Sequence, residues 1–550
     1  MLRYYYYHLV RIMYDVAICG YGPTGMLAAI LLGRAGHRVA VIERYRLLYN
    51  LPRVGIVHDD VLRMFQQIGI SDRIAPATCF LPTYELGFHG EVLLSNRVAE
   101  HEIHGWPEMT SIYQPTFEAE LDAVVKSLPT VDVLQGWTLS DYEQAGDRVT
   151  LSLAEDTGAA KRIDARYLIG SDGGNSFVRR ALGIEYEDLG FDQDWLVIDA
   201  KLQRPRPDLP FLRQFCEPEQ PGMTMQMGPH HRRWSFMIFD GETVEDATAP
   251  ESVWKRLKRP EGGTADDFEL VRVAAYKFRS LHARSWRRGR VFLAGDAAHQ
   301  MPPFLAQGLC SGFRDSHNLA WKLDLVLRGE ANDTLLDAYE AERGPSARAT
   351  IVESMRVGLN VNERDPEKIA LRNDQLRAMQ AANAGAMQEK KLIAFRVPPL
   401  ADGLISGTAG GSILPQARIS YGGREAPFDE LAGGRFAILS RNGDAWAALA
   451  PDLRDFWNGI GGTSIAFGPG GAEDVEGAYA ALMDRTGCDV LVKRPDFNLF
   501  GGCATAAELP ALLEDLQSRL YATGTPARSP SGAGMAAMHD NRSANHSQVE

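Results

Sequence analysis

The stretch "AICGYGPTGMLAAILLGRAGHRVAVIE", residues 17–43, has the pattern of a strand, a glycine-rich turn, a helix and a second strand. Pro23 suits the first turn of a helix, where its missing N–H costs little, and Gly36 is typical of a helix end. The closing RVAVIE is almost continuously apolar, as in a parallel strand buried on both faces. The stretch therefore predicts a βαβ unit and an α/β fold.

The turn carries the pattern G-x-G-x-x-G at Gly20, Gly22 and Gly25. The first glycine permits a tight turn, the second lets a pyrophosphate approach the backbone, and the third lets helix and strand pack closely. Glu43 ends the second strand, where its carboxylate can accept hydrogen bonds from ribose hydroxyls. It would repel a 2′-phosphate, so the pattern predicts FAD or NAD. The alternative is an ordinary glycine-rich βα turn.

The composition is typical of a globular protein with two or three domains. The chain has 550 residues, of which 45% are hydrophobic and 23% charged, and a net charge of −13 that disfavours nucleic acid as a partner. The six cysteines include no C-x-x-C pair, which predicts reduced thiols in a cytoplasmic protein with neither a disulfide framework nor a zinc site. No apolar run reaches the ~20 residues of a membrane span.

The pattern of the chain changes several times after the βαβ unit. Residues 1–13 form an N-terminal extension, and the first domain takes up residues 14–193 and 277–400. Residues 194–276 have the alternation of antiparallel strands, which predicts an inserted β-rich domain. Residues 408–523 alternate strand and helix patterns and predict a third domain. The tail, residues 524–550, has the composition of a disordered segment.

Two motifs further along the sequence distinguish between FAD and NAD. They are "YLIGSDGGNSFVRRALG" at residues 167–183 and "RVFLAGDAAHQMPPFLAQGLCSGFRDSHNLAWKL" at residues 290–323. Together with the glycine motif, they resemble the three fingerprints of the FAD-dependent aromatic-ring hydroxylases, the family of para-hydroxybenzoate hydroxylase. The resemblance implies a Rossmann-like FAD-binding domain, FAD as cofactor, and NADH or NADPH and O2 as co-substrates.

The resemblance also assigns FAD contacts along the chain. Asp172 and Gly173 match the motif associated with the pyrophosphate and nicotinamide binding, although a turn with an Asx cap is the alternative. Asp296, after the turn residue Gly295, matches the aspartate that binds the ribityl chain, with a helix N-cap as the structural alternative. The remaining residues assigned to the cofactor site are Arg44, Arg53, Gln114, Pro303, Gln307 and Gly308.

The resemblance identifies no catalytic side chain. His299, Pro302 and Gly308 are candidates for the loop beside the flavin ring. A free histidine has a pKa near neutrality, which would suit a general base. In the family, however, this histidine belongs to the fingerprint, and we favour a structural or flavin-loop role.

Further motifs, among them "DWLVIDA" at residues 194–200 and "HRRWSFMI" at 231–238, resemble 3-hydroxyphenylpropionate hydroxylase and related phenol hydroxylases. Residues 408–523 resemble the thioredoxin-like domain of the larger phenol and polyketide hydroxylases. A redox thioredoxin needs C-x-x-C, whereas the cysteines here are Cys488 and Cys503. We therefore expect a structural domain or an oligomer contact, with a homodimer left open.

These observations predict an enzyme that hydroxylates a small phenolic substrate ortho to its hydroxyl, such as 3-hydroxyphenylpropionate, in aromatic catabolism. Residues 194–276 would form one wall of the substrate pocket. An alternative is a tailoring hydroxylase that acts on a polyketide or another large aromatic. A third is a non-enzymatic protein of the same fold that binds a partner protein, as GDP-dissociation inhibitors do.

Overall fold

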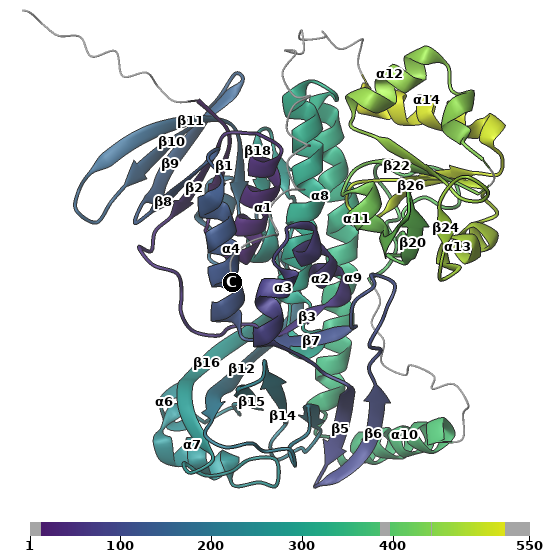
Figure 1. Cartoon of the computed structure of the whole chain (residues 1–550). Helices are drawn as coiled ribbons and strands as arrows, with labels where there is room; N and C mark the ends of the chain where they lie inside the picture. Colours follow the sequence, from purple (N-terminus) through teal and green to yellow (C-terminus); the bar gives the residue numbers. More distant parts are fainter. Residues whose placement is uncertain (1–12, 385–396, 442, 523–550) are drawn as a thin grey trace, which may run out of the picture.

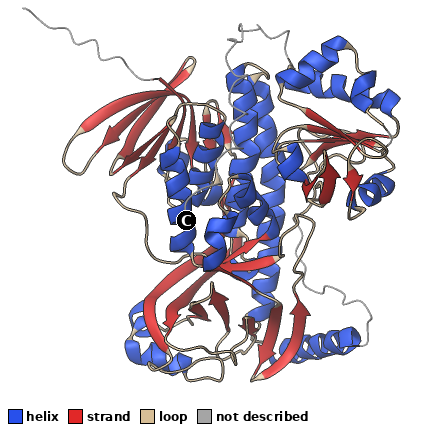
Figure 2. Ribbon diagram, viewed as in Figure 1, coloured by secondary structure: helices blue, strands red, loops and turns tan. Residues whose placement is uncertain are grey.

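The computed structural model describes residues 13–384, 397–441 and 443–522 (Figure 1). The predicted tail, and all but the last residue of the predicted N-terminal extension, lie outside the described residues. Over these residues the chain is a mixed α/β protein built around two eight-stranded sheets and a smaller four-stranded sheet (Figure 2).

The first sheet has a parallel core in the order β18-β11-β1-β2-β8, and antiparallel strands extend it. Strand β1, helix α1 and strand β2 confirm the predicted βαβ unit. The elements are β1 (Met13–Cys19), α1 (Pro23–Arg34), β2 (Val39–Glu43), β8 (Val131–Gln135), β9 (Thr138–Ala145), β10 (Arg148–Ala154), β11 (Ala160–Gly170), β17 (Arg287–Arg288) and β18 (Val291–Leu293).

Two long helices run through the middle of the molecule, α8 (Gly308–Arg328) and α9 (Asp337–Val361) (Figure 1). Helix α8 packs closely on α1, because a Cβ atom at Gly312 would collide with the Thr24 side chain. The Ser316 hydroxyl donates to the Thr24 carbonyl at 2.7 Å. The first turn of α1 is thus fixed against α8. Helix α4 (Gln114–Ser127) also contacts α1.

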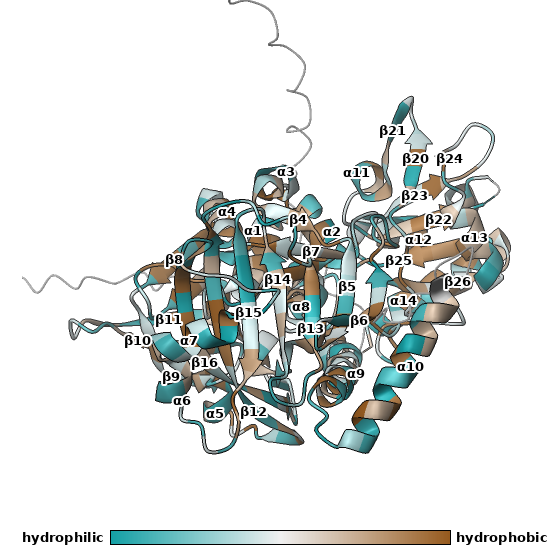
Figure 3. Cartoon of the chain, turned by 90° about the horizontal axis from the view of Figure 1, so that it is seen from below, coloured by the Kyte–Doolittle hydropathy of each residue, from teal (hydrophilic) through white to brown (hydrophobic). Residues whose placement is uncertain are grey.

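The second sheet is mostly antiparallel, in the order β19-β16-β12-β15-β14-β13-β5-β6. One face, with Trp234 and Phe236, packs against the short helices α6 (Val244–Thr248) and α7 (Pro250–Leu257). Seen from below, hydrophilic and hydrophobic residues mix along its strands (Figure 3). The strands are β5 (Thr83–Phe88), β6 (Glu91–Arg97), β12 (Tyr186–Leu202), β13 (Leu212–Phe215), β14 (Gly222–Met227), β15 (His231–Met237), β16 (Phe268–Ala283) and β19 (His299–Gln300).

This second sheet extends beyond the predicted segment 194–276. Strands β5 and β6 join it through a parallel pairing of β5 with β13. Strand β12 also begins before residue 194, and β16 ends after residue 276. A strand alternation reveals that a segment is extended but not which distant segment pairs with it.

The C-terminal part of the chain forms a four-stranded sheet in the order β23-β22-β25-β26, with a small separate sheet beside it. It lies against α8 and α9 (Figure 1). Its elements are β20 (Arg418–Tyr421), β21 (Arg424–Pro427), α11 (Phe428–Ala432), β22 (Ala437–Ser440), α12 (Pro451–Gly459), β23 (Thr463–Ala466), β24 (Glu473–Asp474), α13 (Ala478–Thr486), β25 (Val490–Lys493), β26 (Leu499–Cys503) and α14 (Leu509–Leu520).

Shorter elements connect these parts: β3 (Ile56–His58), α2 (Asp59–Gln67), α3 (Ser71–Ile74), β4 (Thr78–Phe80), β7 (Met109–Ile112), α5 (Phe177–Ala181) and α10 (Pro366–Ala384). Helix α10 lies along β6 at the edge of the second sheet. Within the described ranges, no helix is both long and apolar enough to cross a membrane.

Candidate functional site

The three sequence motifs meet at one edge of the first sheet. Strands β2, β1, β11 and β18 are neighbours and run parallel, so their carboxyl ends lie side by side. In this register Cys19 faces Gly170, and Gly170 faces Leu293. Glu43 is the last residue of β2, and the glycine turn, Asp172 and Asp296 follow the ends of β1, β11 and β18. Open α/β sheets bind ligands at this edge.

The glycine turn combines two crowded positions with an open one. Gly20 has φ +109°, and a Cβ there would collide with the Ser171 carbonyl. A Cβ at Gly25 would collide with the Gly20 carbonyl. At Gly22, in contrast, a Cβ would meet no atom within 4 Å. Gly22 is also the N-cap of α1, and the uncapped first-turn N–H groups can bind a phosphate there.

Glu43 is held at the end of β2 by backbone donors. Its two oxygens accept the Tyr21 N–H at 2.9 Å and the Tyr45 N–H at 3.0 Å. Arg44 instead stacks its guanidinium over the Tyr45 ring, 4.8 Å from the centroid. A carboxylate oxygen can accept more than one hydrogen bond, so Glu43 keeps the capacity to bind a ribose.

Asp172 has one engaged oxygen and one that lacks a partner. Its Oδ2 accepts the Phe177 N–H at 2.7 Å and the Val178 N–H at 3.2 Å, both in the first turn of α5. Its Oδ1 is buried and has no hydrogen-bond partner among the described residues. Burial raises the pKa of this carboxyl. Asp172 therefore supports the first turn of α5, whose N-cap is Ser176, while its Oδ1 is left without a partner. Gly173, at φ +81°, turns the chain behind it.

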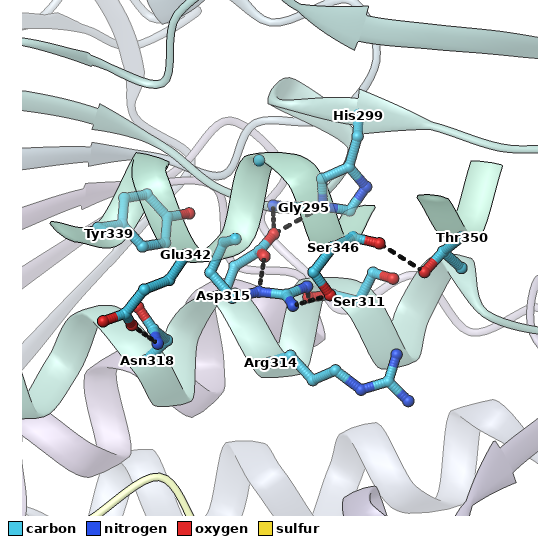
Figure 4. Close-up of polar contacts among 12 residues, drawn as sticks. Gly295, His299, Ser311, Arg314, Asp315, Asn318, Tyr339, Glu342, Ser346 and Thr350 are labelled. Carbon is cyan, nitrogen blue, oxygen red and sulfur yellow. Dashed lines mark hydrogen bonds and ion pairs between the residues drawn. The ribbon is translucent and has the colours of Figure 1, made fainter. Parts of the chain in front are cut away.

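The turn that carries Asp296 is held by a hydrogen bond between its backbone and Asp315 of α8. Gly295 has φ +60° and donates its N–H to Asp315 Oδ2 at 3.0 Å. Asp296 itself is exposed at the same edge as the glycine turn. Figure 4 shows Gly295 and His299 on the same side of Asp315. The backbone of this turn is thus anchored while the Asp296 side chain stays accessible.

His299 is a buried partner of Asp315. Its Nε2 lies 2.7 Å from Asp315 Oδ2, and its ring packs against Trp286 with centroids 5.3 Å apart. Arg343 donates to the other oxygen of Asp315 at 2.9 Å. Burial alone would raise the pKa of Asp315, but His299 and Arg343 outweigh it and lower that pKa. Because the imidazole has no exposed surface, this geometry suits a positioning role.

The loop at residues 302–308 is held by contacts on several sides. The Pro302 carbonyl accepts the Ser354 hydroxyl at 2.6 Å, and Ala306 adopts the left-handed conformation with φ 55°. Gln307 is buried and accepts a hydrogen bond from Arg314 at 2.8 Å. Gly308 begins α8, and a Cβ there would meet only Met301, at 3.9 Å. A ligand could therefore approach the backbone at Gly308.

Gln114 and Arg53 differ in how available they are. Gln114 Oε1 accepts the N–H groups of Arg53 and Val54, at 2.8 and 2.6 Å, and its Nε2 donates to Glu118. Gln114 therefore shapes the loop and has little capacity left for a ligand. The Arg53 side chain is 47% exposed. Its carbonyl is held from the second sheet by Arg233, at 2.7 Å.

Sequence reasoning missed the residues that support these contacts: Asp60, Asp199, Arg233, Arg314, Asp315 and Arg343. Arg314 and Asp315 did carry a signal, since they are two adjacent charged residues inside the third motif. Asp199 and Arg233 lie within the two motifs that resemble phenol hydroxylases, where nothing pointed to a role for either side chain, and Asp60 and Arg343 lie outside the quoted motifs.

Two family models match the chain. One, described as an FAD binding domain, covers residues 13–354, and the other, described as the HcaD C-terminal domain, covers residues 411–519. A probable NADH-specific resorcinol 4-hydroxylase of Rhodococcus jostii (strain RHA1) is 39% identical over 94% of this chain and 96% of its own. A 3-(3-hydroxy-phenyl)propionate/3-hydroxycinnamic acid hydroxylase of Mycobacterium sp. (strain JLS) is 32% identical over 96% of both.

Solved structures share the fold at lower identity. The flavin-dependent monooxygenase PieE, in complex with FAD and substrate, matches with a TM-score of 0.78 and 22% identity over 92% of this chain and 99% of its own. The ternary complex of aklavinone-11 hydroxylase with FAD and aklavinone matches with a TM-score of 0.73 and 24% identity over the same shares.

Proposed function

Because the chain belongs to the FAD-binding domain family and is an FAD-dependent aromatic hydroxylase, we propose that it uses NADH and O2 to hydroxylate a small phenol ortho to its hydroxyl group. The observation that carries the proposal is the convergence of three motifs at one sheet edge, with open space beside Gly22. The name of the 39% identical relative supports NADH as the reductant.

The residues at this edge fit a dinucleotide. The α1 N-terminus at Gly22 suits the pyrophosphate, and Glu43 suits the adenosine ribose. Asp296, exposed on an anchored turn, suits the ribityl hydroxyls, and the loop at residues 302–308 lies next along the chain. When bound, FAD supplies the redox chemistry that takes hydride from NADH and activates O2.

The second sheet would form the substrate domain. It contacts the loop directly, because Trp195 packs edge-on against Phe304 with ring centroids 5.5 Å apart. Gln214 lies 3.4 Å from the Phe304 carbonyl. A substrate between sheet and loop would be shielded from water, as oxygen transfer requires. We also assign residues 408–522 to a thioredoxin-like domain without redox function, because Cys488 and Cys503 are buried free thiols.

We propose a substrate class that the two relatives' names share. Resorcinol and 3-(3-hydroxyphenyl)propionate are both phenols with a second group meta to the hydroxyl. The neighbour that binds the larger aklavinone is less similar in sequence, so a single-ring phenol is favoured over a polyketide. Free cysteines throughout the described residues support a reducing compartment such as the cytoplasm.

The test begins with the visible spectrum of the purified protein. NADH oxidation is then followed with resorcinol, with 3-(3-hydroxyphenyl)propionate and without a phenol, and the products are identified. A yellow protein whose oxidation rate rises with either phenol, and which forms the ortho-hydroxylated product, supports the proposal. If neither phenol stimulates a yellow protein, the small-phenol assignment is wrong. If the protein takes up no FAD, the cofactor assignment fails as well.

A further inference from the structure

A buried chain of three side chains leads from α2 to the loop before α8. Asp60, in the first turn of α2, accepts a hydrogen bond from Arg314 Nε at 2.5 Å. Arg314 Nη1 in turn donates to Gln307 Oε1 at 2.8 Å. All three residues are less than a tenth exposed. These hydrogen bonds therefore join α2, which is far away in sequence, to the loop beside the proposed flavin position.

The direction of the Gln307 amide follows from this contact. Arginine has only donors, so the group that faces Arg314 must be the amide oxygen and not the amide nitrogen. The Nε2 group consequently points to the other side of the Gln307 side chain, as a donor. Without Arg314 the amide could rotate, and its buried oxygen would lack a partner.

Both charges of the pair persist at neutral pH. Burial alone would raise the pKa of Asp60, but Arg314 outweighs it and lowers that pKa to about 2. Burial acts to lower the pKa of Arg314, but Asp60 outweighs it and the pKa is raised. The pair is therefore a permanent feature of the folded protein over the pH range of activity assays.

The loop itself needs support. Ala306 has a left-handed backbone, which a non-glycine residue adopts only when its surroundings enforce it. On one side His58 Nε2 lies 3.2 Å from the Leu305 carbonyl, and on the other Arg314 holds Gln307. His58 and Asp60 flank the start of α2, so one short segment supports the loop at two points.

We propose that Arg314, fixed by Asp60, is a positioning residue that orients Gln307 so that its Nε2 donates to the flavin ring. This inference rests on the proposed function, because it requires FAD beside the loop. Arg314 would touch neither the flavin nor the substrate. It would act by removing the freedom of the Gln307 amide before FAD binds.

The test uses the full chain reconstituted with FAD. Arg314→Met removes the donors while roughly keeping the side chain's length. We expect the FAD dissociation constant to rise about tenfold, as for the loss of one oriented hydrogen bond, and the visible absorption band of bound FAD to shift. Gln307→Leu should give the same two changes. The double variant should bind FAD no more weakly than either single variant, because both substitutions break the same series of hydrogen bonds.

Two further variants separate orientation from stability. Gln307→Glu keeps an acceptor for Arg314 but loses the Nε2 donor, so FAD affinity should fall while thermal stability is retained. Arg356→Met is the matched control, because among the described residues Arg356 pairs only with Glu353, on the exposed side of α9. The FAD affinity and spectrum of this variant should equal those of the unaltered protein.

The outcomes are distinguishable. If Arg314→Met and Gln307→Leu both bind FAD with unchanged affinity and spectrum, the inference is wrong. If Arg314→Met does not fold, Gln307→Leu and Gln307→Glu still decide, because they leave the Asp60–Arg314 pair intact. If the unaltered protein takes up no FAD, the proposed function fails instead.

Discussion

Two buried groups of charged residues lie between α8 and α9, and they connect to different parts of the molecule. Figure 4 shows Asp315 of one group and Glu342 of the other. The first is centred on Asp315, which binds Gly295, His299 and Arg343. The second is centred on Glu342, which binds Lys322 at 2.8 Å and Arg494 at 2.6 Å. We call them the Asp315 group and the Glu342 group.

The difference lies in what each group holds. The Asp315 group anchors the turn that presents Asp296, so it serves the ligand site. The Glu342 group joins α9 to the C-terminal part of the chain, because Arg494 bridges Glu342 and Asp496. Asn318 donates to both carboxylates, at 2.7 and 2.9 Å. Burying charges is costly unless each is paired, and here the same physics fixes a binding turn in one place and a domain contact in the other.

The largest effect should follow from Arg494→Met. It would leave Glu342 and Asp496 buried together with only Lys322 to balance them. Removing one partner of a buried ion pair costs about 3–5 kcal/mol. Urea unfolding should show this loss, and Arg356→Met, which breaks an exposed pair with Glu353, should show almost none. A loss equal to that of the control would mean that the Glu342 group does not hold the C-terminal part.

Asp315→Asn should instead act mainly on FAD binding. The variant removes the charge that pairs with Arg343 and His299, and it loosens the Gly295 turn. The free energy of FAD binding should become less favourable by about 2 kcal/mol. We expect the FAD dissociation constant to rise by more than tenfold, measured by titration of the apoprotein. Glu342→Gln is the comparison, and it should lower stability more than FAD affinity. If Asp315→Asn lowered mainly the stability and Glu342→Gln mainly the FAD affinity, the Asp315 group would not serve the ligand site as described.

Acid should weaken both groups. The pKa values of Asp315 and Glu342 lie below their usual range, because burial, which acts to raise them, is outweighed by His299 and Arg343 for Asp315 and by Arg494 and Lys322 for Glu342. Their stabilisation is therefore present above the unfolded-state pKa of about 4 and is lost as pH falls through the lower folded values. The stability difference between the unaltered protein and Asp315→Asn should shrink below about pH 4. A difference that stays constant down to pH 2 would exclude this linkage.

The smallest effect should be that of His299→Gln. Glutamine can still donate to Asp315, so the turn should persist and hydroxylation should fall by less than about tenfold, with an unchanged pH–rate profile. A general base would show a loss of about 10²- to 10⁴-fold on replacement. Single-turnover measurements across pH distinguish these results, and a loss of that size together with an altered profile would restore His299 as a base.

Sequence reasoning succeeded where the signal is local. The βαβ unit is confirmed because strand, turn and helix signals lie together in residues 17–43. The glycine turn and Glu43 lie at one sheet edge, as their place at the ends of predicted strands implied. Reasoning was incomplete where distant segments meet: Arg213 and Glu85 pair across the second sheet although they are 128 residues apart.

The supporting residues show the same limit. Arg314 and Asp315 are adjacent in sequence, but successive helix residues differ by about 100° in direction, and Figure 4 shows their side chains on different sides of α8. One contacts Asp60, which is 254 residues away, and the other contacts Gly295. A motif can mark both residues as unusual, but only the packed structure reveals their separate partners.

The parallel core of the first sheet has a consequence for biosynthesis. Its central strand β1 leaves the ribosome first, yet β11 and then β18 must be made before the core is complete. The ion pair of Glu342 can form only later, after Arg494 has been translated, 152 residues further along the chain. Such long-range pairing slows folding and exposes unpaired strand edges in the meantime. Nascent chains that end before α8 should therefore need chaperones. A chain truncated before residue 408, which lacks the C-terminal part, should aggregate instead of forming a smaller enzyme.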